Sequence, residues 1–148
     1  MADHSSAMER RMVIRLLHYW RDITSAGQRF PPLSHVNPET LAESWDWCYV
    51  FEAGAGVVVP GFSFIGSGFA NDLDGPLEDQ TILGLEKRSL LANACERFGL
   101  AWEKAVPVSF GGAFENPGSE TIIYRSIILP LSGELHYLMG ATNCRVAA

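Results

Sequence analysis

Cysteine is scarce in this chain, and its spacing is poor for pairing. Three cysteines occur in 148 residues, at Cys48, Cys95 and Cys144. An odd number of widely spaced cysteines excludes a disulfide framework and a Cys-x-x-Cys metal knuckle. The four histidines are also scattered, and none has metal-ligand spacing to another. The sequence therefore predicts a chain without structural disulfides or a metal, suited to a reducing cytoplasm.

Long apolar runs and a surplus of positive charge are missing as well. No stretch approaches the roughly 18 apolar residues that a membrane span requires. The start, MADHSSAMERR, lacks the apolar core of a signal peptide. The chain has 11 Lys and Arg against 17 Asp and Glu, for a net charge of −6. Because an acidic chain repels a phosphate backbone, we expect no nucleic-acid partner, and we expect no membrane span.

What is present is the composition of a folded domain. Apolar residues make up 47% of the chain and charged residues 19%, which is typical of globular proteins. A chain of this length buries a sizeable core without crosslinks. We expect a single domain in which residues 1–30 form an amphipathic helix and residues 31–148 form the body.

Apolar residues recur at helical spacing near the N-terminus. Ser6 and Glu9 have the spacing of a capping box, and Gly27 followed by Pro31-Pro32 predicts the end of the helix. The apolar side chains fall within a sector of roughly 140°. Four of them form a stripe that is too apolar to leave in water, so we expect a homodimer interface there. These four are Val13, Leu16, Leu17 and Trp20.

The body begins with a short helix and a strand pair. Asn37-Pro38 predicts a helix that starts there and runs to about Ser44. A strand over 48–52, a turn at 54–56 and a return strand over 57–66 follow, with a bulge or edge feature at Pro60-Gly61. Strict alternation along the return strand places Phe62 and Phe64 on one side.

The rest of the body predicts helix and then strand. Thr81 is the expected cap of a helix over 81–98, and Gly99 is its expected stop. Strands then follow at 105–110 and on both sides of the turn at 130–134, within 121–142. Two early strands and three late strands with helices between them predict an α+β fold with a five-stranded antiparallel sheet.

Several short motifs occur in order along nearly the whole chain. They are Tyr19-Trp20-Arg21, Pro31, Asn37-Pro38, Phe64-Ile65-Gly66-Ser67-Gly68, Asp72-Leu-Asp-Gly75, and Tyr124-Arg125 leading into Leu129-Pro-Leu-Ser132. Together they resemble the motifs of the PAS superfamily, and more closely those of small stand-alone bacterial PAS-like proteins. The resemblance implies helices over one face of the sheet and a role in signal transduction. Such modules bind a small molecule, haem or flavin between sheet and helices, or mediate protein–protein contacts.

A ligand cavity in such a fold would lie between the sheet and the helix predicted at 81–98. Its candidate lining is apolar and aromatic, with few groups that titrate. The candidates are Phe64, Leu91, Cys95, Phe98, Phe110 and Tyr124.

The sequence gives little support for a bound cofactor or metal. The 81–98 segment contains no histidine for haem, and His136 on the last strand is expected either to have its hydrogen bonds satisfied or to face solvent. Asn143-Cys144-Arg145 is similar to the triplet of flavin-photoreceptor PAS domains but lies near the C-terminus. The acidic cluster that begins at Asp72 breaks the EF-hand pattern, which favours a solvated loop with helix-capping carboxylates. We expect no haem, flavin or metal.

These observations predict a non-catalytic cytoplasmic PAS-type sensor or adaptor. We expect it to form a homodimer and to bind a signalling protein, a small apolar ligand or both. The alternative is a small α+β enzyme or carrier that acts on an apolar ligand in an internal cavity. Catalysis is less favoured because Ser63 lies mid-strand, outside an esterase elbow, and Ser67 has no convincing His and carboxylate partners nearby in the sequence.

Overall fold

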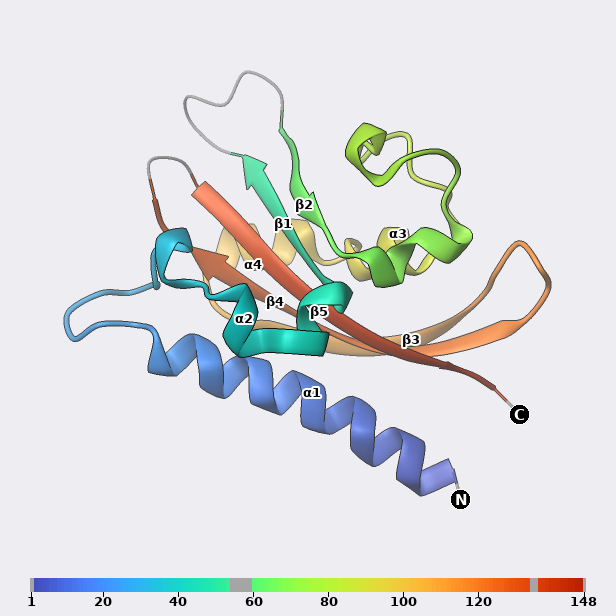
Figure 1. The fold of residues 1–148 in the computed structure, drawn as a ribbon, viewed down its shortest axis with the longest axis horizontal. Coiled ribbons are helices and arrows are strands. Elements are labelled where there is room, and N and C mark those ends of the chain that lie inside the picture. The colour runs from blue at the N-terminus through green and yellow to red at the C-terminus, as the bar shows by residue number, and fades with distance from the viewer. Residues whose placement is uncertain (1, 54–59, 134–135, 148) are drawn as a thin grey trace.

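A five-stranded antiparallel sheet organises the chain, in a computed structural model that describes residues 2–53, 60–133 and 136–147 (Figure 1). The strands are β1 (Cys48–Ala53), β2 (Gly61–Ile65), β3 (Val108–Glu115), β4 (Thr121–Leu131) and β5 (His136–Val146). Their order is β2-β1-β5-β4-β3, so the last strand lies at the centre. This confirms the predicted α+β fold and its strand pair at the C-terminus.

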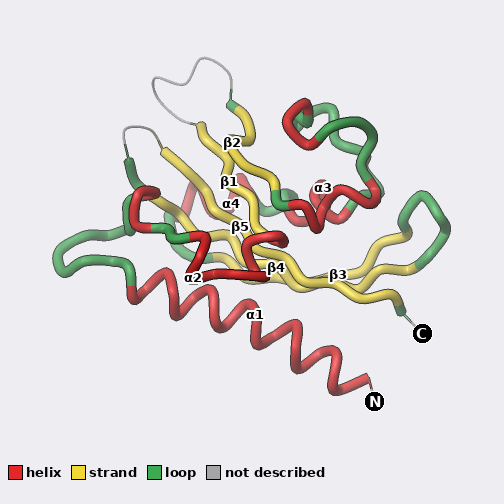
Figure 2. Tube along the Cα trace, viewed as in Figure 1, coloured by secondary structure: helices red, strands yellow, loops and turns green. Residues whose placement is uncertain are grey.

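Helices lie on both faces of the sheet. Figure 2 shows helical segments in red on either side of the yellow strands. Helix α1 (Ala2–Asp22) packs on one face, against β4 and β5. The segment between β2 and β3 covers the other face, where α3 (Leu90–Ala94) and α4 (Phe98–Lys104) lie. Among the described residues, no helix has both the length and the apolar character to cross a membrane.

Helix α1 buries its apolar stripe within its own chain. Met12, Leu16 and Trp20 are buried in one cluster with residues of β1, β4 and β5. The indole Nε1–H of Trp20 donates to the carbonyl oxygen of Pro130 at 2.7 Å, which fixes the helix across β4. The predicted start at Ser6 and end at Gly27 were both wrong, because the helix begins at Ala2 and ends at Asp22.

Short helical segments precede β1. They are η1 (Leu33–His35), α2 (Pro38–Leu41) and η2 (Ala42–Trp47). The Asn37 side chain accepts the N–H of Glu39 at 3.0 Å, so the predicted cap and Pro start are confirmed. The α-helix ends at Leu41 instead of near Ser44, and the chain continues in the tighter η2.

The long helix predicted over 81–98 was wrong. Turns occupy 81–89 after the short η3 (Ser67–Asp72) and η4 (Leu77–Asp79), and two separate helices follow. Thr81 accepts the N–H of Gly84 in a local turn, whereas Ser89 caps α3 by accepting the N–H of Ala92 at 3.1 Å. Gly99, the predicted stop, lies inside α4.

A β-bulge in the first strand pair reverses the expected facing of one aromatic residue. Val50 pairs with Phe64 and Phe51 pairs with Phe62, so Ser63 is an extra residue. Phe62 therefore packs on the α3 and α4 side, whereas Phe64 packs on the α1 side. The prediction that the two rings share a face was wrong. The predicted turn at 54–56 and residues 57–59 of the return strand lie outside the described residues.

Candidate functional site

Five of the six predicted cavity residues come together between the sheet and α3. Leu91, Cys95 and Tyr124 are buried in one cluster, and Phe98 and Phe110 pack against it. Phe64 is the exception, because the bulge turns it to the opposite face. There its ring stacks on Trp45 with centroids 4.3 Å apart.

Aromatic side chains fill the space in which the cavity was expected. Tyr49 is fully buried there, and its ring centroid lies 5.6 Å from that of Phe98 and 6.1 Å from that of Phe69. Its hydroxyl donates to the carbonyl oxygen of Ala94 at 3.5 Å. Its ring also occupies the place that a Cβ on Gly140 would take. This side of the sheet is therefore a packed core.

Two thiols are buried, Cys48 on the α1 side of the sheet and Cys95 on the α3 side, and burial favours their neutral form. Burial, with a smaller contribution from the charge of Asp46, raises the pKa of Cys48 to about 12. Burial likewise raises the pKa of Cys95 and of Tyr49 well above their ordinary values. Because the thiolate is the nucleophilic form of cysteine, burial at Cys48 and Cys95 disfavours a reactive thiol at both positions.

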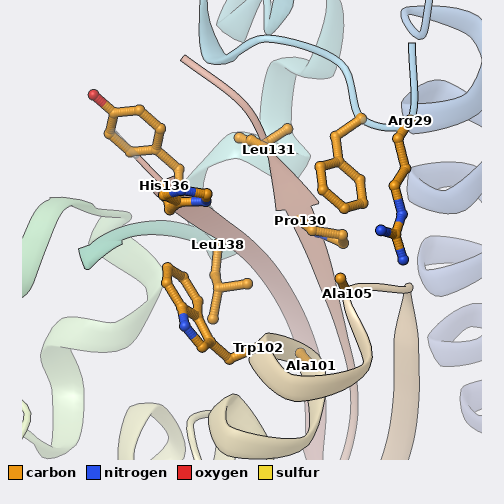
Figure 3. A pocket seen from close by; sticks show the side chains of 10 residues that line it. Arg29, Ala101, Trp102, Ala105, Pro130, Leu131, His136 and Leu138 are labelled. Atoms are coloured by element: carbon orange, nitrogen blue, oxygen red, sulfur yellow. The ribbon is translucent and has the colours of Figure 1, made fainter. Parts of the chain in front are cut away.

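A cleft opens instead at the other end of the sheet, beside α4 (Figure 3). Its volume is about 350 Å³. It is formed by the segment before η1, by α4 and its C-terminal end, and by the adjoining ends of β4 and β5. The lining residues are Arg29, Phe30, Ala101, Trp102, Ala105, Pro130, Leu131, His136, Tyr137 and Leu138.

The cleft has an apolar floor and a more polar rim. Ala101 and Leu138 are buried, whereas Arg29 and His136 are exposed. Figure 3 shows Arg29 on one side of the cleft and Trp102 with His136 on the other side, where Leu138 also lies. The rings of Trp102 and His136 meet edge to face, with centroids 5.7 Å apart.

Arg29 places a permanent positive charge beside an aromatic ring. Its guanidinium carbon lies 5.2 Å from the centroid of Phe30. A guanidinium that is stacked on an aromatic ring still has N–H groups that can donate to a carboxylate or a phosphate. Such a cation binds the anion more strongly where water is partly excluded. An apolar floor, aromatic walls and one cation together suit a small anion with an apolar body.

The polar side chains in the described lining of the cleft are those of Arg29, Trp102, His136 and Tyr137. None of the described residues that line it carries a carboxylate or a thiol, so none provides a carboxylate to orient the His136 imidazole. Within the described part of the chain, no group of three or more His, Cys, Asp or Glu side chains could hold a metal.

The remaining residues that the sequence singled out stabilise the fold. Leu16 and Trp20 are covered by the chain's own sheet, so the uncovered apolar stripe that motivated a dimer at α1 is not present. Val13 and Leu17 are partly buried beside them, and the dimer itself stays a prediction. Asp72 caps α3 by accepting the N–H of Leu90 at 2.9 Å, which confirms the role predicted for a carboxylate of the acidic loop.

Sequence reasoning missed the cleft because three distant segments build it. Helix α4, which carries Trp102, was not predicted, and Arg29 was assigned to the end of the first helical region. One signal was available: Phe98, Ala101, Trp102 and Ala105 have the spacing of a helix face. His136, which was considered for haem and expected either to have its hydrogen bonds satisfied or to face solvent, is exposed on the rim.

Comparison with models of known protein families finds none that matches this chain, and a search of curated proteins finds no match either.

Proposed function

We propose that this protein is a PAS-type sensory or adaptor module that binds a small amphipathic anion in the cleft beside α4. The proposal joins the resemblance of the sequence motifs to the observed succession of two strands, helices and three strands in one antiparallel sheet. The cleft is the observation that carries the choice of ligand.

The packed interior argues for the cleft over a central cavity. A ligand between the sheet and α3 would have to displace Tyr49, Phe69 or Phe98, each of which packs against other aromatic rings. Interiors packed in this way lose stability when volume is added. The cleft already provides open volume, so binding there requires no such rearrangement.

The expected ligand carries a flat apolar body and a carboxylate or similar anion. Its body would lie on Leu138 and against Trp102, and its anion would pair with the Arg29 guanidinium. Because Arg29 is exposed, this pair contributes the modest free energy of a surface ion pair, and the contact of the apolar body with Leu138 and Trp102 supplies the rest.

A protein partner is the second candidate, because apolar side chains are exposed around the same helix. Leu100, Trp102 and Val106 are among the most exposed large apolar residues described, and Trp102 is 38% exposed. Exposed apolar side chains that cluster on one element mark contact surfaces more often than scattered ones do. A partner would cover the rim of the cleft instead of filling it.

Calorimetric titration with indole-3-acetate tests the ligand proposal, with neutral indole-3-acetamide as the matched probe. We expect the acetate to bind and Arg29→Gln to weaken it about twofold to fivefold, because an exposed ion pair contributes up to about 1 kcal/mol. Arg21→Gln, which removes an exposed arginine of α1 outside the cleft, should leave the affinity unchanged. Equal affinity for both probes, or equal effects of the two variants, would contradict recognition of the anion by Arg29.

A further inference from the structure

Strand β3 leaves one whole edge of the sheet unpaired. It is the last strand in the order β2-β1-β5-β4-β3, and its described neighbour is β4. Its register with β4 is unbroken over all eight residues. Residues 109, 111, 112, 113 and 115 are exposed.

The direction of the free backbone groups follows from the hairpin that joins β3 to β4. The N–H of Asn116 donates to the carbonyl oxygen of Glu120 at 2.9 Å, so Asn116 points its backbone groups toward β4. Because alternate residues of a strand point their backbone groups to the same edge, 110, 112 and 114 also face β4. Residues 109, 111, 113 and 115 therefore point theirs outward.

This edge lacks the features that keep other strand edges from pairing. Between Val108 and Phe114 the strand contains no charged residue, no proline and no bulge. The opposite edge strand, β2, is short, carries the bulge at Ser63, and contacts η4. Natural sheets protect their exposed edges with such devices, and an unprotected long edge is a pairing site.

We propose that β3 pairs with β3 of a second copy of this chain, antiparallel and with the two-fold axis at Gly112. This register places Phe110 opposite Phe114 of the partner subunit, in the positions where cross-strand side chains approach most closely. It places Gly111 opposite Ala113 of the partner subunit, and these residues exchange backbone hydrogen bonds through the groups that point outward.

The pairing of the two phenylalanines extends contacts that exist already. Phe110 and Phe114 both lie against Tyr124, with ring centroids 6.2 and 5.9 Å from it. Aromatic pairs across neighbouring strands are among the stabilising ones. The aromatic row would then continue from one subunit into the next.

A second copy fits this edge better than an unrelated strand does. In a homodimer the same segment, β3, forms both strands of the interface. Because Gly112 lies on the two-fold axis, no two side chains meet at that point. The one charged residue, Glu115, lies opposite Ser109 of the partner subunit, so no like charges face each other. An edge of eight residues forms a small interface, so we expect a dimer of micromolar affinity. This inference is independent of the cleft and of its ligand.

Sedimentation velocity on the full chain at low and high micromolar concentration tests the pairing. Ala113→Pro removes an N–H that points outward, and proline is tolerated on edge strands. We expect it to raise the dimer dissociation constant about tenfold or more, because the two-fold axis repeats the loss in both copies. Ala113→Ser keeps the N–H at the same exposed position and should leave the dimer intact.

Crosslinking reports the register even where the proline variant folds poorly. Ser109→Cys combined with Glu115→Cys should form two disulfides between subunits, because the two positions face each other at a distance that suits a disulfide. Within one strand they lie about 20 Å apart and cannot bridge. Ser109→Cys with Ala113→Cys should remain reduced.

Three results would overturn the proposal. One is an unmodified chain that stays monomeric at high micromolar concentration. Another is a dimer that Ala113→Pro and Ala113→Ser affect equally. The third is a disulfide in the 109 and 113 pair with none in the 109 and 115 pair, which would place the axis elsewhere.

Discussion

The ring of Tyr49 lies across Gly140, its direct partner in the β1–β5 register. A Cβ at position 140 would overlap the ring, so glycine is what allows the tyrosine to lie flat on the centre of the sheet. In that position the ring also reaches α3, through Ala94, and Phe98 of α4. The close approach of Tyr49 in β1 to Gly140 in β5 therefore lets the tyrosine ring fill the space between the sheet and α3.

Gly140→Ala should destabilise the protein by about 1–3 kcal/mol or more, because the added methyl displaces a fully buried ring. Chemical denaturation measures this change. Gly99→Ala, in α4 with open space around its Cβ position, should instead stabilise the protein by about 0.5–1 kcal/mol. Equal effects at the two glycines would show that the Tyr49 ring lies elsewhere.

Cys95→Trp should lower the melting temperature and gain nothing in return, since Cys95 is surrounded by packed side chains. Cys95→Ala, which removes only a sulfur atom, should cost far less. Thermal melts of both variants, with and without a panel of small apolar ligands, check this. An open cavity at Cys95 would be revealed if the tryptophan were accommodated without loss of stability and abolished stabilisation by a ligand.

Leu16→Glu should unfold the chain or detach α1, at a cost of about 3 kcal/mol or more, because it places a carboxylate in the core. Ile14→Glu, on the same helix, should change stability by less than about 0.5 kcal/mol. The two positions differ in exposure, 0% for Leu16 and 52% for Ile14. If Leu16→Glu gave a well-folded monomer from a dimer, the stripe would belong to an interface between subunits.

Asp72 should make stability depend on pH. Burial raises the pKa of its carboxyl above the ordinary 3.8, although the N–H of Leu90 bonds to it and opposes the shift. The folded chain therefore holds this proton more tightly than the unfolded chain does. The resulting stability is complete below the ordinary pKa and is lost as pH rises through the raised value.

Asp72→Asn keeps an oxygen that can accept the N–H of Leu90 and removes the titration. Between pH 3.8 and neutral pH, the variant should gain stability relative to the unmodified chain as pH rises. Melting temperatures across that range measure the difference. Asp79→Asn, in the exposed η4, serves as the control. A difference that does not change with pH would contradict the assignment.

Elements fixed by local pattern could be predicted from the sequence. The apolar runs that form β4 and β5, the Asn37-Pro38 helix start and the amphipathic stripe of α1 each follow from neighbouring residues. The stripe did not indicate what covers it. An amphipathic helix packs equally well on its own sheet or on another subunit, and the bond from Trp20 to Pro130 spans 110 residues.

The errors came from single local interactions that compete with the pattern. One extra residue at Ser63 moved Phe64 to the other face, and α3 is capped by Ser89, eight residues after the predicted cap Thr81. The cleft required α4, the start of β5 and the segment at Arg29 together. Such a site depends on tertiary contacts that periodicity does not contain.

Amide and indole NMR of the labelled chain, titrated with indole-3-acetate, tests the central claim most directly. If binding takes place in the cleft, the largest shifts will be at the indole N–H of Trp102 and the amide of Leu138, and Arg29→Gln will reduce them. Shifts centred on Leu91 and Cys95 would place the ligand between the sheet and α3. That result, or no shifts at all, would contradict the claim that the interior is packed and that the ligand binds in the cleft beside α4.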